Sequence, residues 1–190
     1  MKTVFFDVDT QLDFLFPAGA LYVPGAEDIV AALGGLTKFA ASNKLQIVST
    51  ADAHTENDPE FRTWKPHCVA GTTGQQKAAV TLVGTPAIVG TSGAIALAPQ
   101  IIVEKQKLDC FTNPNLRPLL KQLAAERYVV YGVVSELCVR CAAFGLLSTG
   151  ARVELAADAI KTLNPVAESQ MLEEFRAAGG VVTTVAAIIS

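Results

Sequence analysis

The sequence has little charge and no long apolar run, and both absences restrict its partners. Of its 190 residues 17% are charged, and the formal net charge is −3 at pH 7, so there is no basic surplus to favour nucleic acid or an anionic membrane. No apolar run approaches the roughly 20 residues that cross a bilayer. The N-terminal MKTVFFDVDT becomes acidic too early for a signal peptide. We expect a cytoplasmic protein with no nucleic-acid or membrane partner.

Two common nucleotide-binding motifs are also absent. No Gly-x-Gly-x-x-Gly follows the first strand-like segment, and no Gly-x-x-x-x-Gly-Lys-Ser/Thr occurs in the chain. The most frequent dinucleotide and nucleoside triphosphate sites therefore have no support in the sequence.

The pattern of apolar residues predicts alternating strands and helices. Strand-like segments occupy residues 3–9, 45–54, 100–105, 127–134, 151–158 and 180–188, and helical periodicity occupies residues 25–44, 113–126, 136–150 and 164–179. Asn113 and Asn164, each followed by proline, are expected N-caps, and Gly150 and Gly179 are expected helix ends. We predict a single-domain, three-layer α/β/α fold with a mostly parallel six-stranded sheet.

Polar residues gather where these strands end. Asp9 ends the first strand, Asp52 and His54 follow the second, Lys105 ends the third, and Cys138 follows the fourth. Ligands bind beyond the carboxyl ends of parallel strands. An acid, candidate metal ligands, a lysine and a thiol therefore converge on one edge of the sheet.

The four cysteines allow more than one interpretation. Cys138 and Cys141 have the Cys-x-x-Cys spacing, but a thioredoxin-type redox pair would follow the first strand of a small domain. Cys138 lies in the expected first helical turn, where backbone N–H groups lower a thiol pKa from about 8.5 and can hold an oxyanion. A buried packing role is the alternative for Cys138, and it is our expectation for Cys141.

Asp9 is the candidate base for this thiol, with Lys105 supplying compensating charge, because a carboxylate at the end of an apolar strand is costly without partners. The alternative is an aspartate that caps the following turn. Asp7 shares a strand face with Asp9 by alternation, but it lies further inside the sheet. Asp13 is interpreted as a loop or helix-cap acid.

Both histidines of the chain, His54 and His67, fall in one segment. Asp52 and His54 are two residues apart on a strand end, so their side chains can face one site. Glu60 lies between the two histidines. Two imidazoles with one or two carboxylates suit Zn, Fe or Mn, which predicts a divalent metal site.

Five ordered segments resemble the isochorismatase-like cysteine hydrolases, and among these the nicotinamidases. They are residues 9–14 (DTQLDF), 52–54 (DAH), 64–72 (WKPHCVAGT), 104–106 (EKQ) and 132–139 (GVVSELCV). The resemblance implies a catalytic triad of Asp9, Lys105 and Cys138. It also implies a cis peptide bond between Val133 and Val134, and an oxyanion hole made by the N–H groups of Val134 and Cys138.

The resemblance further implies a metal held by Asp52, His54 and His67, with Glu60 standing where many members have another histidine. It places the substrate ring against Phe14, Trp64 and Val133. The implied reaction is hydrolysis of nicotinamide to nicotinate and ammonia through a cysteine thioester, in a protein that binds a small amide and forms homo-oligomers.

Other readings remain within the resemblance. Carbamoylsarcosine-type and ureidoacrylate-type amidases keep the triad but do not usually carry the Asp-x-His pair, and isochorismatases proper usually lack the cysteine. A catalytically idle binding module on the same fold is a further alternative. Leu137 and residues 108–111 depart from the nicotinamidase pattern, so the sequence leaves the substrate open.

Overall fold

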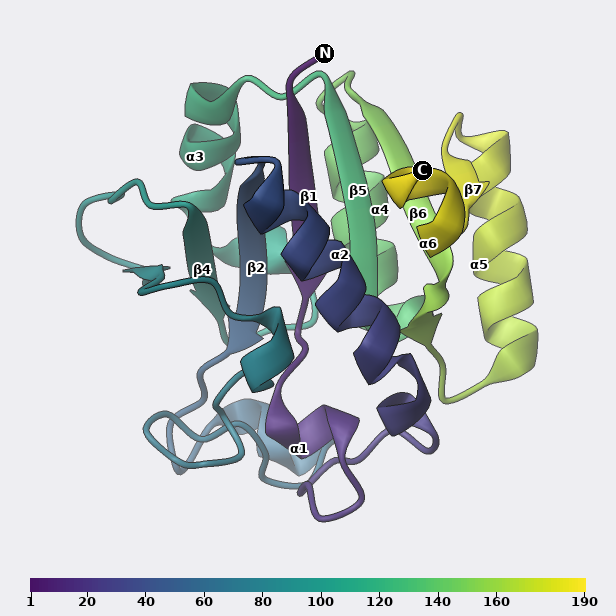
Figure 1. Ribbon diagram of the computed structural model, residues 1–190. Helices are drawn as coiled ribbons and strands as arrows, with labels where there is room; N and C mark the ends of the chain where they lie inside the picture. Colours follow the sequence, from purple (N-terminus) through teal and green to yellow (C-terminus); the bar gives the residue numbers. More distant parts are fainter.

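Seven parallel strands form one sheet that draws on the whole chain (Figure 1), and the computed structural model describes all of residues 1–190. The strand order is β3-β4-β2-β1-β5-β6-β7, and every pair of neighbours is parallel. The strands are β1 (Thr3–Val8), β2 (Gln46–Asp52), β3 (Ala87–Val89), β4 (Gln100–Lys105), β5 (Arg127–Val133), β6 (Arg152–Lys161) and β7 (Val181–Thr183).

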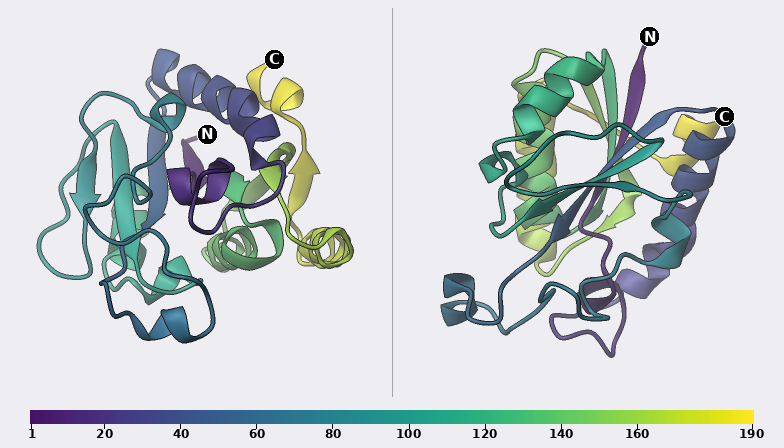
Figure 2. Two further views of the ribbon diagram at one scale, coloured as in Figure 1. Left: turned by 90° about the horizontal axis from the view of Figure 1, so that it is seen from below. Right: turned by 90° about the vertical axis from the view of Figure 1, so that its left-hand side faces the viewer.

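Helices cover both faces of the sheet, which gives the three layers predicted from the alternating pattern (Figures 1 and 2). Helices α2 and α6 pack on one face and α3, α4 and α5 on the other, while short α1 lies beyond the end of β1. The helices are α1 (Leu12–Leu15), α2 (Val30–Ser42), α3 (Leu116–Leu123), α4 (Arg140–Leu147), α5 (Pro165–Ala177) and α6 (Val185–Ile189). None of them has both the length and the apolar character needed to cross a bilayer.

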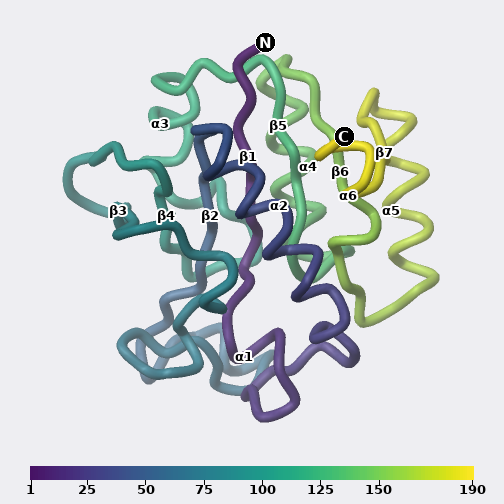
Figure 3. Tube along the Cα trace, in the orientation of Figure 1, coloured from purple at the N-terminus to yellow at the C-terminus, as the bar shows by residue number.

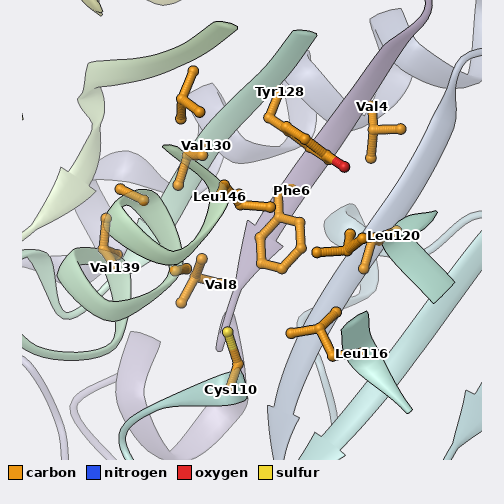
Figure 4. Packing of buried hydrophobic residues seen from close by; sticks show 14 of the residues in the cluster. Val4, Phe6, Val8, Cys110, Leu116, Leu120, Tyr128, Val130, Val139 and Leu146 are labelled. Atoms are coloured by element: carbon orange, nitrogen blue, oxygen red, sulfur yellow. The ribbon is translucent and has the colours of Figure 1, made fainter. Parts of the chain in front are cut away.

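Strand β1 contributes to two separate cores because it is covered on both faces. Val4, Phe6 and Val8 pack under α3 and α4 (Figure 4), whereas Phe5 belongs to the core beneath α2. Full burial of such a side chain contributes about 1.5–3 kcal/mol. This two-sided burial explains why the strand reads as a continuous apolar run.

The strand prediction needs two corrections. The sheet has seven strands instead of the predicted six. The additional one is the edge strand β3, whose three residues between a proline and a glycine are too few to show a strand pattern. The segment 180–188 is divided between β7 and α6, so its second half is helical. Thr184 causes the change, since its side chain accepts the N–H of Ala187 and caps the helix.

The two asparagine caps have different outcomes. Asn164 accepts the N–H groups of Val166 and Ala167 and caps α5 as predicted. Asn113 does not cap α3, which begins three residues later at Leu116. Asn113 is buried; its Oδ1 accepts the N–H of Asn115 at 2.8 Å and its amide N–H donates to the carbonyl of Glu104 at 2.7 Å, so it links the approach to α3 with β4.

The carboxyl ends of β1, β2, β4 and β5 meet at the lower end of the molecule in Figure 1. Helix α1 and the long connection after β2 gather beneath this edge (Figure 3). The strands therefore supply a rigid platform, and the connections supply the walls of a site.

Candidate active site and metal centre

Asp9 reaches the site through an unusual backbone conformation. Its φ of 50° lies in the left-handed region, which costs most residues about 1–2 kcal/mol and is adopted most readily by Gly, Asn and Asp. The carboxylate accepts the Thr50 hydroxyl at 2.6 Å. Strand alternation would have placed Asp9 on the face of Asp7, but the left-handed turn brings it to the side of Thr50 and Lys105.

Asp7 is therefore not a second acid of the site, and its expected shared face with Asp9 is wrong. Its carboxylate forms a buried ion pair with Lys77 at 3.0 Å. It also accepts the hydroxyls of Thr10 at 2.9 Å and Ser49 at 3.0 Å. Asp7 is thus fully engaged away from the pocket.

Lys105 lies between two carboxylates and beside the thiol. Its Nζ is 2.8 Å from Asp9, 2.5 Å from Asp52 and 3.6 Å from the Sγ of Cys138. Burial alone would lower the lysine pKa, but the two carboxylates raise it well above its usual value. Lys105 therefore stays protonated and supplies fixed positive charge.

Cys138 lies in the turn Ser135–Val139, which is a π-helical turn at the start of α4. Burial raises its pKa well above that of a free thiol, and the charges of Asp9 and Asp52 act in the same direction against the opposing effect of Lys105. The expected lowering of the pKa is wrong, because burial and the two carboxylates outweigh the charge of Lys105. The resting side chain is a neutral thiol that needs a base.

The chain before Cys138 is shaped as the resemblance implies. The peptide bond between Val133 and Val134 is cis. The N–H of Val134 makes no hydrogen bond in the structure, and Val134 lines the pocket that contains Cys138. This N–H is available to an oxyanion, while the role of the Cys138 N–H stays a prediction.

Asp52, His54 and His67 converge next to the triad. Their candidate ligand atoms all lie within 4.8 Å of one another. The Oδ2 of Asp52 is 3.8 Å from Nε2 of His54 and 3.6 Å from Nε2 of His67. The Nε2 of His54 is buried and has no hydrogen-bond partner. Two nitrogens and one oxygen with this convergence fit Zn, Fe or Mn.

Neighbouring groups orient these three side chains. Nδ1 of His67 lies 2.7 Å from the carbonyl of Lys65, and Nδ1 of His54 lies 3.1 Å from Asp58. The carbonyl of Lys65 engages the Nδ1 of His67, whereas the Nδ1 of His54 lies in ionic contact with Asp58 without a hydrogen bond. In both histidines Nε2 is the ring nitrogen near Asp52. Gln11 holds Asp52 by accepting its N–H at 2.7 Å and donating to its carbonyl at 2.9 Å.

Neighbouring charges shift the pKa values of Asp52 and His54. Burial would raise the pKa of Asp52, but the charge of Lys105 and the contacts with His54 and His67 lower it. Burial would lower the pKa of His54, but Asp52 and Asp58 raise it. Sequence reasoning missed Asp58 and Gln11. Gln11 lay inside the DTQLDF segment, whereas Asp58 gave no distinguishing signal in a polar loop.

Glu60, the fourth predicted ligand, lies at the side of the pocket. It lines the same cavity, but it does not belong to the group of converging ligand atoms. Its nearest ionic partner is Lys107, at 3.7 Å. The contact between Glu60 and a metal that the sequence predicted is untested, and this placement leads us to expect a metal held without Glu60.

An apolar pocket of about 470 Å³, including its open mouth, joins Asp9 and Cys138 of the triad to Asp52 and His67 of the candidate metal ligands. The three predicted ring-binding residues, Phe14, Trp64 and Val133, all line it. The Phe14 ring lies 5.4 Å from that of His67, between centroids. Leu163, from the connection after β6, also lines it and was missed, because nothing local links that connection to the site.

Comparison with known proteins is decisive for the family. Residues 86–187 match the model of the isochorismatase domain, which is more than half of the chain. The chain belongs to the isochorismatase family. No curated protein matches the sequence. The family assignment agrees with the observed α/β fold and with the resemblance seen in the sequence.

Solved structures match nearly the whole chain. A pyrazinamidase of Pyrococcus horikoshii in complex with zinc is 27% identical with a TM-score of 0.82, covering 97% of this chain and 99% of that one. PnC1 of L. infantum, in complex with nicotinate, is 30% identical with a TM-score of 0.76, covering 97% and 93%. An N-carbamoylsarcosine amidase from Thermoplasma acidophilum is 23% identical with a TM-score of 0.79, covering 97% of each chain, and shares the fold.

Proposed function

We propose that this isochorismatase-family protein is a nicotinamidase that hydrolyses nicotinamide to nicotinate and ammonia. One observation carries the proposal: a single apolar pocket joins Asp9 and Cys138 to Asp52 and His67. A flat aromatic ring with an amide at one side and a ring nitrogen at the other matches this combination of apolar walls, thiol and ligand group.

The first half of the reaction uses Cys138 and Asp9. As Sγ attacks the amide carbon, the thiol proton passes to Asp9, whose pKa burial raises despite the opposing charge of Lys105. A base with a raised pKa accepts a proton more readily. Lys105 keeps its charge beside both groups, and the N–H of Val134 can donate to the amide oxygen as it becomes negative.

The second half returns this proton and repeats the exchange with water. Asp9 gives its proton to the amide nitrogen, the C–N bond breaks, and ammonia leaves a thioester on Cys138. Water then attacks the thioester carbon while Asp9 accepts a water proton. When the C–S bond breaks, Asp9 returns that proton to the sulfur, and the thiol is restored.

Asp52, His54 and His67 would hold the divalent metal. When bound there, the metal would fix and polarise a ring nitrogen of the substrate. The remaining work falls to the chain: Phe14 and Trp64 line the pocket and would enclose the ring.

The charges of the pocket argue against amides that carry a carboxylate, as the carbamoylsarcosine-type and ureidoacrylate-type substrates do. No arginine or lysine is among the lining residues. Lys105 is already paired with Asp9 and Asp52, and Lys107 lies beside Asp58 and Glu60. Apart from the metal, which the ring nitrogen of nicotinamide would occupy, a bound carboxylate would meet acidic groups and no basic side chain, which is unfavourable in a buried site.

Ammonia release tests the proposal directly. The purified protein, loaded with zinc or manganese, is offered nicotinamide, N-carbamoylsarcosine and ureidoacrylate. We expect release from nicotinamide, its loss in Cys138→Ala, and most of it retained in the matched variant Cys141→Ala. Turnover of the carboxylate-bearing amides with nicotinamide untouched would refute the proposal, and so would equal loss in both cysteine variants.

A further inference from the structure

Glu136 connects the nucleophile turn to a distant part of the chain. It lies two residues before Cys138 and is partly buried. Its Oε1 accepts the N–H groups of Leu163 at 3.1 Å and Asn164 at 2.9 Å, and its Oε2 accepts the hydroxyl of Thr162 at 2.7 Å. All three hydrogen bonds thus go to residues 162–164, the connection between β6 and α5.

Leu163 is the member of that connection that lines the pocket. Its side chain is 44% exposed, so burial among core residues does not fix its place. Its position depends on its backbone, which Glu136 holds directly. The backbone N–H of Asn164 also donates to the hydroxyl of Thr162 at 2.9 Å, so residues 162–164 are hydrogen-bonded to one another as well as to Glu136.

Hydrogen bonds that a carboxylate accepts are charge-assisted, and these are shorter and stronger than bonds between neutral groups. A single carboxylate that accepts three of them can hold an otherwise exposed connection in one place. The same short turn carries Leu137 and Cys138, which also line the pocket. Any displacement of residues 162–164 relative to this turn therefore changes the width of the opening above the thiol.

We propose that Glu136 is a specificity-positioning residue: it holds Leu163 across the pocket mouth and so limits the size of the aromatic amide that reaches Cys138. This inference rests on the proposed amidase function for its substrate. The limit acts on ring substituents and fused rings, because Leu163 belongs to the open side of the pocket and not to the triad.

Two thiol reagents measure the opening without relying on turnover. Iodoacetamide is small and N-phenylmaleimide is bulky, and mass spectrometry of the peptides separates labelling of Cys138 from that of Cys141. The quantity compared is the ratio of the bulky to the small reagent's rate at Cys138. The variants are Glu136→Ala, Glu136→Gln and Leu163→Ala, with Val166→Ala as the control, a side chain 77% exposed on α5 and outside the pocket lining.

We expect the ratio to rise about tenfold in Leu163→Ala and Glu136→Ala. An apolar site usually distinguishes ligands that differ by one or a few carbon groups by about this factor. Glu136→Gln should stay near the wild-type ratio, because its amide oxygen still accepts both N–H groups and its amide N–H can face the Thr162 oxygen. Thr162→Val removes one of the three hydrogen bonds and should raise the labelling ratio by a smaller factor. This variant replaces Glu136→Ala in the test if Glu136→Ala does not fold.

An unchanged ratio in Glu136→Ala or in Leu163→Ala would overturn the proposal. Equal slowing of both reagents in Glu136→Ala would also overturn it, because that result indicates a general disturbance of the nucleophile turn. The substrate arm compares KM for nicotinamide and quinoline-3-carboxamide, and the larger amide should gain selectively in Leu163→Ala and Glu136→Ala. A wild-type protein that hydrolyses neither amide would refute the amidase assignment alone, since the labelling ratio still reports the mouth.

Discussion

Asp58 offers a direct test of how the metal ligands are oriented. Its Oδ2 lies 3.1 Å from Nδ1 of His54, and its side chain is 7% exposed. A carboxylate behind a ligand histidine fixes the ring orientation and makes Nε2 a better donor. In Asp58→Asn the shape is kept but the charge is lost, so the histidine is held less firmly and donates less strongly.

Loss of such a partner typically weakens metal binding about 10–100-fold, which corresponds to about 1.4–2.7 kcal/mol. The assay is a competition titration of zinc between the metal-free protein and a chromophoric chelator. Glu56→Gln is the matched control, since Glu56 is an exposed acid of the same segment and should keep wild-type affinity.

Asp58 has a second role, and the choice of asparagine separates the two. Its Oδ1 accepts the N–H of Glu60 at 2.9 Å and caps the turn Pro59–Arg62. Asparagine caps such turns about as well as aspartate, so the local fold should persist in Asp58→Asn. Wild-type zinc affinity in a folded Asp58→Asn protein would refute the orienting role and leave Asp58 as a cap alone.

Three further outcomes are expected. Asp9→Asn should keep the left-handed backbone but lower turnover of nicotinamide about 10²–10⁴-fold; unchanged steady-state turnover would place the base elsewhere. Glu60→Ala should retain wild-type metal content by elemental analysis, since Glu60 stands outside the ligand group, and a clear loss would make it a ligand. Burial would raise the pKa of Glu154, but ion pairs with Arg127 and Arg152 lower it below its usual 4.5. Its stabilisation is therefore present above pH 4.5 and is lost as the pH falls through the folded value. Glu154→Gln should cost about 1 kcal/mol near pH 7 by denaturant titration, and a cost that persists at pH 3 would contradict this.

The layered fold could be predicted because local patterns agree with the tertiary structure. The apolar runs that became β1, β2, β4 and β5 are long enough to be recognised without knowledge of their neighbours. The edge strand β3 has only three residues, which is too few for a period to be visible. The prediction of a single strand over residues 180–188 was wrong because an apolar run of that length suits either a strand or a helix. Thr184 divides the segment by capping α6.

The candidate site was predictable only in part, since local signals reveal residue types but not conformations. Asp9, Lys105 and Cys138 each follow or end a strand, and parallel strands bring such residues together. The left-handed turn at Asp9 and the hydrogen bonds from Glu136 to residues 162–164 depend on contacts between distant segments. The thiol pKa was misjudged for the same reason, because burial is a tertiary property.

The charges around Lys105 decide which side chain of the triad can move protons. If Lys105 lost its proton, Asp9 and Asp52 would remain as two buried carboxylates without the cation that now lies 2.8 Å from one and 2.5 Å from the other. That loss is unfavourable, which is why the pKa of Lys105 is raised. Protonation of Asp9, by contrast, leaves Lys105 paired with Asp52. The proton can therefore pass between Cys138 and Asp9 while the lysine charge stays constant, and Lys105 acts through its field and its contacts, not as a base.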